Sequence, residues 1–168
     1  MTPKQTYTQW QATRVRRWHT NPALTASDDP VGAHSARMMI LALYFKPDFS
    51  RNGMITILQH DLAEIITGDV PYPVKASNPA FNEALVIADD AANKELGVLP
   101  FLLTPREASL IKLVDRLDAW FWMQSHTTDP HKRWGDYEHD MAKAAEALDV
   151  DVKFNALIST HHMEGSLR

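Results

Sequence analysis

The sequence predicts an all-α fold, a helical bundle of about six or seven helices that forms one domain over residues 1–168. Three observations support this fold class. Apolar residues recur at the three-to-four-residue spacing of helices along most of the chain. The run Thr104-Pro105-Arg106-Glu107 combines a capping box with a first-turn proline. No segment shows the period-two alternation and turn punctuation of a strand, and no internal repeat is found.

The first helix is expected over residues 5–19, where aromatic and apolar residues share one face. Its end carries a basic group of residues, Arg14, Arg16 and Arg17. Turn-forming residues at Asn21-Pro22 and over residues 27–30 then predict a loop. A second helix should begin near Val31 and stop before Pro47.

The third helix should open at Ser50 and continue through Ile66, with Gly68 as its C-terminal stop. After it, Pro71 and Pro73 predict an extended, stiff loop, because proline restricts the backbone.

The fourth helix should begin at Asn78-Pro79 and end at Gly97. The helix that starts at the capping box should end before Asp129-Pro130. Weaker patterns predict a helix over residues 134–148 and a short one over 152–161.

The most chemically specific stretch begins with the doublet His60-Asp61. On a helix, His60 and Glu64 would lie one turn apart, with Asp61 beside them on an otherwise apolar segment. A divalent cation binds imidazole nitrogen and carboxylate oxygen together. His34 and Asp115, on two other predicted helices, would complete a metal site at a bundle centre. We therefore predict four ligands, His34, His60, Asp61 and Asp115, for Zn, Co, Mn or Mg.

Composition excludes several classes of protein. The 168 residues include 45% apolar residues and carry a net charge of −4, which argues against general nucleic-acid binding. The absence of cysteine excludes disulfides, thiolate metal sites and cysteine nucleophiles. No charged leader followed by an apolar run is present, and no apolar run reaches the roughly 18 residues that span a bilayer. We expect a cytoplasmic protein without a membrane partner.

The order His34, His60-Asp61, Asp115 resembles the metal-binding pattern of the HD superfamily of phosphohydrolases, which is named after the His-Asp doublet. Over about residues 10 to 125 the chain resembles the small HD-domain 5′-deoxynucleotidases and the phage HD-domain dATP triphosphohydrolases, which remove dATP in phages whose DNA replaces adenine by 2-aminoadenine. The matching motifs are Arg17-Trp18, His34-Ser35, His60-Asp61-x-x-Glu64, Thr67-Gly68-Asp69-x-Pro71 and Lys75. One departure is Gly32-Ala33, because many relatives carry a Glu before the histidine. The resemblance implies a homo-oligomer, located in the host cytoplasm if a phage encodes it.

The same resemblance gives Glu64 and Asp69 acid–base or leaving-group roles. Elementary electrostatics agrees, since a carboxylate near two other acids has a raised proton affinity. The alternatives are that Glu64 is a solvated helix residue and that Asp69 is a cap or turn residue after Gly68.

An acidic metal site alone would repel a nucleotide, so phosphate requires cations. Arg17 offers a bidentate grip and Lys75 a point charge. Trp18 offers a flat face for a nucleobase, and Pro73 could form the opposite wall. The phage relatives imply that this pair fits adenine, whereas core packing is the alternative for Trp18.

The leading hypothesis is a metal-dependent dATP or dNTP triphosphohydrolase that releases deoxynucleoside and triphosphate, because the extra arginines of the first helix suit a longer phosphate chain. The first alternative is a 5′-deoxynucleotidase acting on dNMP. A non-catalytic nucleotide sensor is a further alternative, although it would not need Glu64 and Asp69. A purely structural metal site would leave Arg17, Trp18 and Lys75 without a role.

The remaining histidines and Asp118 are expected at the surface, and several tryptophans in the core or an interface. The histidines are His126, His131, His139, His161 and His162, and the tryptophans are Trp120, Trp122 and Trp134.

Overall fold

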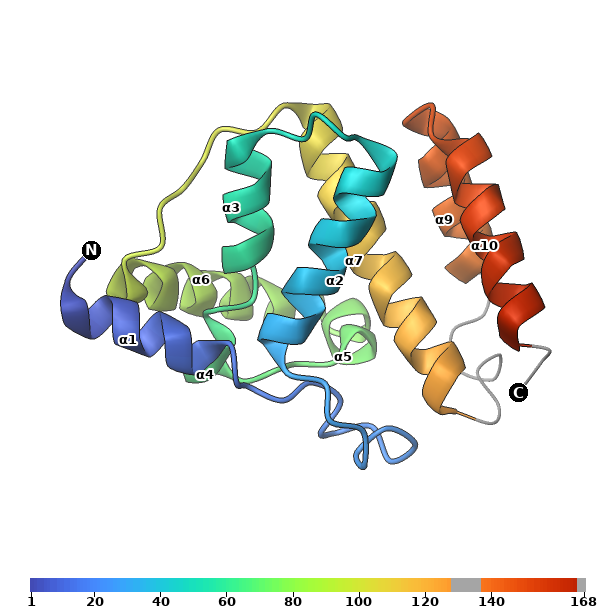
Figure 1. Ribbon diagram of the computed structural model, residues 1–168. Coiled ribbons are helices and arrows are strands. Elements are labelled where there is room, and N and C mark those ends of the chain that lie inside the picture. The colour runs from blue at the N-terminus through green and yellow to red at the C-terminus, as the bar shows by residue number, and fades with distance from the viewer. Residues whose placement is uncertain (128–136, 166–168) are drawn as a thin grey trace. The chain divides into compact units, whose positions relative to one another are not determined.

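The computed structural model describes residues 1–127 and 137–165. Within these ranges the named elements are helices, beside one isolated bridge between Arg16 and Pro30, so the all-α prediction is confirmed (Figure 1). The helices are α1 (Pro3–Ala12), α2 (Val31–Phe45), α3 (Arg51–Gln59), α4 (Glu64–Thr67), α5 (Tyr72–Ser77), α6 (Pro79–Leu96), α7 (Pro105–His126), α9 (Tyr137–Ala147) and α10 (Asp151–Gly165). The predictions for Asp129-Pro130, His131 and Trp134 lie outside the described residues.

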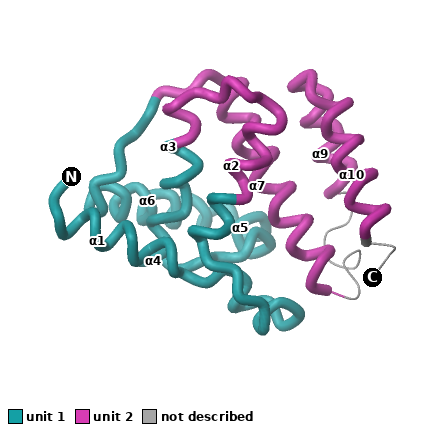
Figure 2. Tube along the Cα trace, viewed as in Figure 1, with its two compact units in different colours: residues 1–36, 55–101 teal, residues 37–54, 102–168 magenta. Residues whose placement is uncertain are grey.

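The chain divides into two compact units, each built from two segments (Figure 2). Unit 1 comprises residues 1–36 and 55–101, and unit 2 comprises residues 37–54 and 102–168. The single domain expected from the sequence stays a prediction. Among the described helices, none combines the length and apolar character needed to cross a bilayer.

In unit 1, α6 is the helix against which α1, α4 and α5 pack. A buried apolar cluster lies between these helices, formed by Ala12, Leu62 and Leu96 with Ile65 and Val98 against it. Two glutamines of α1 also donate hydrogen bonds to the end of α6, Gln5 to the carbonyl of Glu95 (3.1 Å) and Gln9 to that of Leu96 (2.8 Å). These contacts fix the start of the segment that carries the predicted substrate residues.

The first helix ends at Ala12, so its predicted extension to residue 19 is wrong. The following residues instead pair through the backbone with the segment before and at the start of α2. Gly32 donates to Thr13, Val31 to Val15, and Arg17 to Asp29, at 2.8, 2.9 and 3.0 Å. A Cβ on Gly32 would lie 2.9 Å from the Thr13 Cβ, so this close approach requires glycine. Tertiary pairing thus replaces about the last two turns of the predicted helix.

The predicted third helix is also interrupted. α3 ends at Gln59, residues 60–63 form a turn, and α4 begins at Glu64. Leu62 donates to the Gln59 carbonyl (3.3 Å) and Glu64 to the Asp61 carbonyl (3.1 Å), the three-residue spacing of a tight 3₁₀-type turn. His60 and Asp61 therefore lie in a turn and not on a continuous helix.

The stiff loop predicted around Pro71 and Pro73 is the short helix α5. Pro71 occupies its N-cap and Pro73 its first turn. Proline is tolerated there because the first N–H groups of a helix have no partner within the helix.

The starts of α6 and α7, where side chains cap the helix through local hydrogen bonds, agree with the prediction. Asn78 caps α6 through the Phe81 N–H (3.1 Å), and Gly97 ends that helix in the left-handed conformation (φ 70°). Thr104 and Glu107 form the reciprocal capping box of α7, at 3.2 and 3.0 Å.

In unit 2, α7 packs with α9, and α9 with α10. Asp118 is buried on α7, so its predicted surface position is wrong. It accepts hydrogen bonds from Arg37 Nε (2.6 Å) and NH2 (2.9 Å). Likewise, His161 is half-buried, with its ring 5.2 Å from that of Trp120.

Candidate active site

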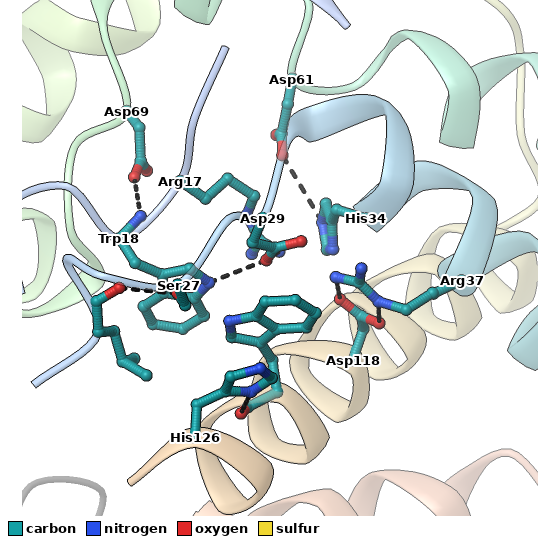
Figure 3. A network of polar contacts seen from close by, with 12 residues as sticks. Arg17, Trp18, Ser27, Asp29, His34, Arg37, Asp61, Asp69, Asp118 and His126 are labelled. Atoms are coloured by element: carbon teal, nitrogen blue, oxygen red, sulfur yellow. Dashed lines mark hydrogen bonds and ion pairs between the residues drawn. The ribbon is translucent and has the colours of Figure 1, made fainter. Parts of the chain in front are cut away.

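Three residues of unit 1 bring potential metal-binding atoms together. His60 Nε2 lies 3.2 Å from His34 Nε2 and 3.1 Å from Asp61 Oδ2, and the latter two atoms are 3.6 Å apart. His34 is fully buried, whereas His60 and Asp61 are partly exposed. Figure 3 shows Asp61 pointing towards His34. These residues form a group that could hold a metal ion.

Local structure explains how the side chains of His34, His60 and Asp61 are oriented. His34 lies in the first turn of α2. His60 and Asp61 occupy the turn after α3, and the Ile57 carbonyl lies 2.6 Å from His60 Nδ1. With Nδ1 beside that carbonyl, Nε2 is the nitrogen that faces the cluster and would bind a metal, the usual arrangement of a metal-binding histidine.

The donor set fits a divalent cation. Ligand atoms around a tetrahedral ion with bonds of about 2.1 Å lie about 3.4 Å apart. The measured separations of 3.1 to 3.6 Å bracket that value. Imidazole nitrogen and carboxylate oxygen are ligands that Zn and related metals accept.

Asp115 lies on α7, within unit 2, and is half-buried. Its predicted role as a further ligand stays a prediction.

Asp61 is held in the charged form. Burial alone would raise the pKa of its carboxyl, but the charge and hydrogen bond of His60, with the charges of His34 and Arg17, outweigh burial and hold the pKa well below its usual range. A charged carboxylate is the form that binds a cation.

Glu64 has the opposite environment at the start of α4. Its Oε2 is buried and has no hydrogen-bond partner among the described residues. Burial and the charges of Asp61 and Asp69 raise the pKa of Glu64 to about 9, although Arg17 and Lys75 oppose the shift. In the metal-free protein the carboxyl is therefore protonated at neutral pH. The alternative of a solvated helix residue does not fit this burial.

Asp69 contacts Trp18. Its Oδ2 accepts the backbone N–H of Trp18 at 3.0 Å (Figure 3). Trp18 has φ 65°, a left-handed conformation that bulky residues rarely adopt. This contact joins residues 51 positions apart, so it is not the local cap or turn contact of the alternative, and the acid–base role of Asp69 stays a prediction.

Asp29 is a residue that sequence reasoning missed, because its segment was interpreted only as a turn. The carboxylate is fully buried, and its Oδ2 accepts hydrogen bonds from Trp18 Nε1 (2.9 Å) and Arg17 NH1 (3.3 Å). The Arg17 guanidinium carbon also lies 5.3 Å from the centre of the Trp18 ring. The one available sequence feature was its position just before the helix that bears His34.

The two remaining predicted substrate residues lie on α5. Lys75 is half-buried, and its charge lowers the pKa of Glu64, which places it in the electrostatic surroundings of that carboxyl. Pro73 is exposed. Substrate binding by either residue stays a prediction.

The extra arginines that favoured a triphosphate make other contacts. Arg16 forms an ion pair with Asp28 (3.2 Å) between two exposed side chains, and the Arg14 guanidinium lies 5.8 Å from the Trp10 ring centre. Phosphate binding by these two arginines stays a prediction.

Comparison with known families gives one result. A family model described as "5′-deoxynucleotidase YfbR-like" matches residues 13–151. The matched range includes the three clustered donors, Asp115 and the predicted substrate residues. No curated protein and no solved structure gives a significant match.

Proposed function

Because the chain belongs to the YfbR-like 5′-deoxynucleotidase family of HD-domain phosphohydrolases, we propose that it hydrolyses 2′-deoxynucleoside 5′-monophosphates to deoxynucleosides and phosphate. This is the alternative from the sequence analysis. The family match favours it over the leading hypothesis of dATP or dNTP triphosphohydrolysis. The observation that carries the proposal is the convergence of His34, His60 and Asp61 in a chain of this family.

The metal would be held by His34, His60 and Asp61, with Asp115 as the proposed fourth ligand. A divalent ion bound there supplies polarisation of a phosphoryl oxygen and lowers the pKa of bound water from about 16 towards 7. Zn, Co, Mn and Mg are the candidates, and imidazole ligands favour the transition metals over Mg.

Glu64 is the proposed acid. Hydrolysis breaks the bond between phosphorus and the 5′-oxygen, and water supplies the new oxygen on phosphate. The departing 5′-oxygen needs a proton, and the burial of Glu64, which raises the pKa of its carboxyl, favours the protonated form that can supply one. Asp69 is the second candidate for this proton transfer, although one of its oxygens already accepts the Trp18 N–H.

Substrate recognition is assigned to the surrounding residues. Arg17 and Lys75 would neutralise the single phosphate, Arg17 through a planar fork and Lys75 as a point charge. Trp18 would stack on the base, with Pro73 on its other side. Homo-oligomeric assembly and a cytoplasmic location remain predictions.

A substrate panel tests the proposal. The purified protein is loaded with each candidate metal and offered dNMPs, dNTPs and ribonucleotides, and phosphate and triphosphate are measured separately. We expect phosphate from dNMPs. Triphosphate from dNTPs would instead support the original leading hypothesis, and binding without turnover would support a nucleotide sensor.

A further inference from the structure

Asp29 contacts both predicted recognition residues at once. Its backbone carbonyl accepts the Arg17 N–H (3.0 Å), and its Oδ2 accepts both Arg17 NH1 (3.3 Å) and the indole Nε1 of Trp18 (2.9 Å). The side chain is completely buried, and Figure 3 shows it beside Arg17 and the indole. A buried carboxylate is stable only when hydrogen bonds and opposite charge compensate its lost hydration. The side chains of Arg17 and Trp18, which donate these hydrogen bonds, are therefore held firmly by Asp29.

The conformation of Trp18 requires such restraint. Its left-handed backbone, at φ 65°, is unfavourable for a residue with a large side chain. Asp69 accepts the backbone N–H (3.0 Å), and Asp29 accepts the indole N–H. The two carboxylates come from separate segments of the chain and hold Trp18 by its main chain and by its ring. Unusual conformations of this kind persist where the surroundings over-determine them, often at binding sites.

We infer that Asp29 is a positioning residue that fixes the Arg17 guanidinium and the Trp18 indole as one preformed unit for the phosphate and the base of a deoxynucleotide. The inference rests on the proposed function. A guanidinium has five N–H donors, so it can contact a carboxylate and a phosphate together. A side chain already held in its bound orientation loses less conformational freedom when the substrate binds.

A spectroscopic test needs no substrate. The chain has 5 tryptophans, and each gives one indole N–H cross-peak in a ¹H–¹⁵N spectrum. The Trp18 peak is the one that is missing in Trp18→Phe. In Asp29→Ala we expect this peak to move to the position of a water-exposed indole and to exchange faster with solvent. The matched control is Asp28→Asn, which removes an adjacent exposed carboxylate and should leave the peak in place.

A kinetic test measures the consequence for the substrate. Hydrogen bonds to charged groups are strong enough that Asp29→Ala should raise KM for dNMP roughly tenfold or more. The value of kcat should stay within about threefold, because the metal donors and Glu64 are retained. Asp29→Asn should raise KM less, since its amide oxygen can still accept the indole N–H. A merely structural role would lower the active fraction, and so the apparent kcat, without raising KM.

The two tests separate the two claims. If the wild-type protein hydrolyses no deoxynucleotide, the proposed function is wrong, and the spectrum still decides whether Asp29 holds Trp18. An unmoved Trp18 peak, or an unchanged KM in an active Asp29→Ala variant, overturns the inference. If Asp29→Ala does not fold, Asp29→Asn replaces it in the kinetic test, where loss of the negative charge beside Arg17 should still raise KM. An unchanged KM in that variant again overturns the inference.

Discussion

The ring nitrogens Nε2 of His34 and Nε2 of His60 lie 3.2 Å apart, although 26 positions separate the two residues in the chain. Both nitrogens lie beside Asp61 Oδ2, at 3.6 Å from His34 and 3.1 Å from His60. Imidazole nitrogens that converge in this way are metal ligands, and the adjacent Asp61 carboxylate adds the negative charge that a cation needs.

Replacing Asp61 with Asn should abolish metal binding and turnover. The change removes the charged donor but keeps the shape, and we expect metal content to fall to background and kcat to fall at least about 100-fold. Elemental analysis of dialysed protein and phosphate release measure the two effects. Asp48→Asn, at an exposed carboxylate, is the control. Full activity in metal-depleted Asp61→Asn would contradict the metal assignment.

Glu64→Gln should separate acid catalysis from metal binding. Loss of the proton donor should lower kcat by roughly 100-fold to 10,000-fold, while metal content stays at the wild-type level. Steady-state kinetics with dNMP and elemental analysis provide the measurements. A kcat within a few-fold of wild type would assign the proton transfer to another group, with Asp69 the first candidate.

The raised pKa of Glu64 also predicts how the stability of the metal-free protein depends on pH. Because the folded-state pKa of Glu64 is raised from 4.5 to about 9, its contribution to stability is fully present below about pH 4.5 and is lost as pH rises towards 9. With a chelator present, the melting temperature of the wild type should therefore fall more steeply across this window than that of Glu64→Gln. Parallel curves for the two proteins would show that Glu64 is not protonated in the folded state.

Lys75→Ala should mainly weaken substrate capture. Removing the point charge should raise KM for dNMP roughly tenfold with a smaller change in kcat, and higher ionic strength should reduce the difference. Kinetics at two salt concentrations measure this. The matched control is Lys94→Ala, an exposed lysine of α6. A KM equal to that of the control would remove Lys75 from the proposed phosphate site.

Asp118→Ala should destabilise unit 2. The Asp118 side chain is 3% exposed and accepts a hydrogen bond from Arg37 at each of its two oxygens. The substitution removes this partner of Arg37, and we expect the free energy of unfolding to fall by about 2 to 4 kcal/mol. Urea unfolding measures it. The control is Asp48→Ala, which breaks an exposed pair with Lys46 and should cost far less. Equal losses in the two variants would mean that burial adds nothing to the Arg37–Asp118 pair.

Local sequence patterns were sufficient to predict the fold class, the starts of α6 and α7 and the identity of three clustered donors. Caps are local hydrogen bonds between residues three apart, so Asn78 and Thr104 specify them without the rest of the molecule. The donors follow from residue chemistry, since His34, His60 and Asp61 are side chains that metals bind.

The ends of α1 and α3, and the groups that hold the site together, depend instead on contacts between distant segments of the chain. α1 stops because residues 13–17 pair with a segment more than ten positions away, and no local pattern records such a partner. Asp29 is a turn-forming residue by composition, and it becomes a buried acceptor only because the loop returns its carboxylate to Arg17 and Trp18. Long-range hydrogen bonds and burial set these features, because they depend on which distant groups meet when the chain folds.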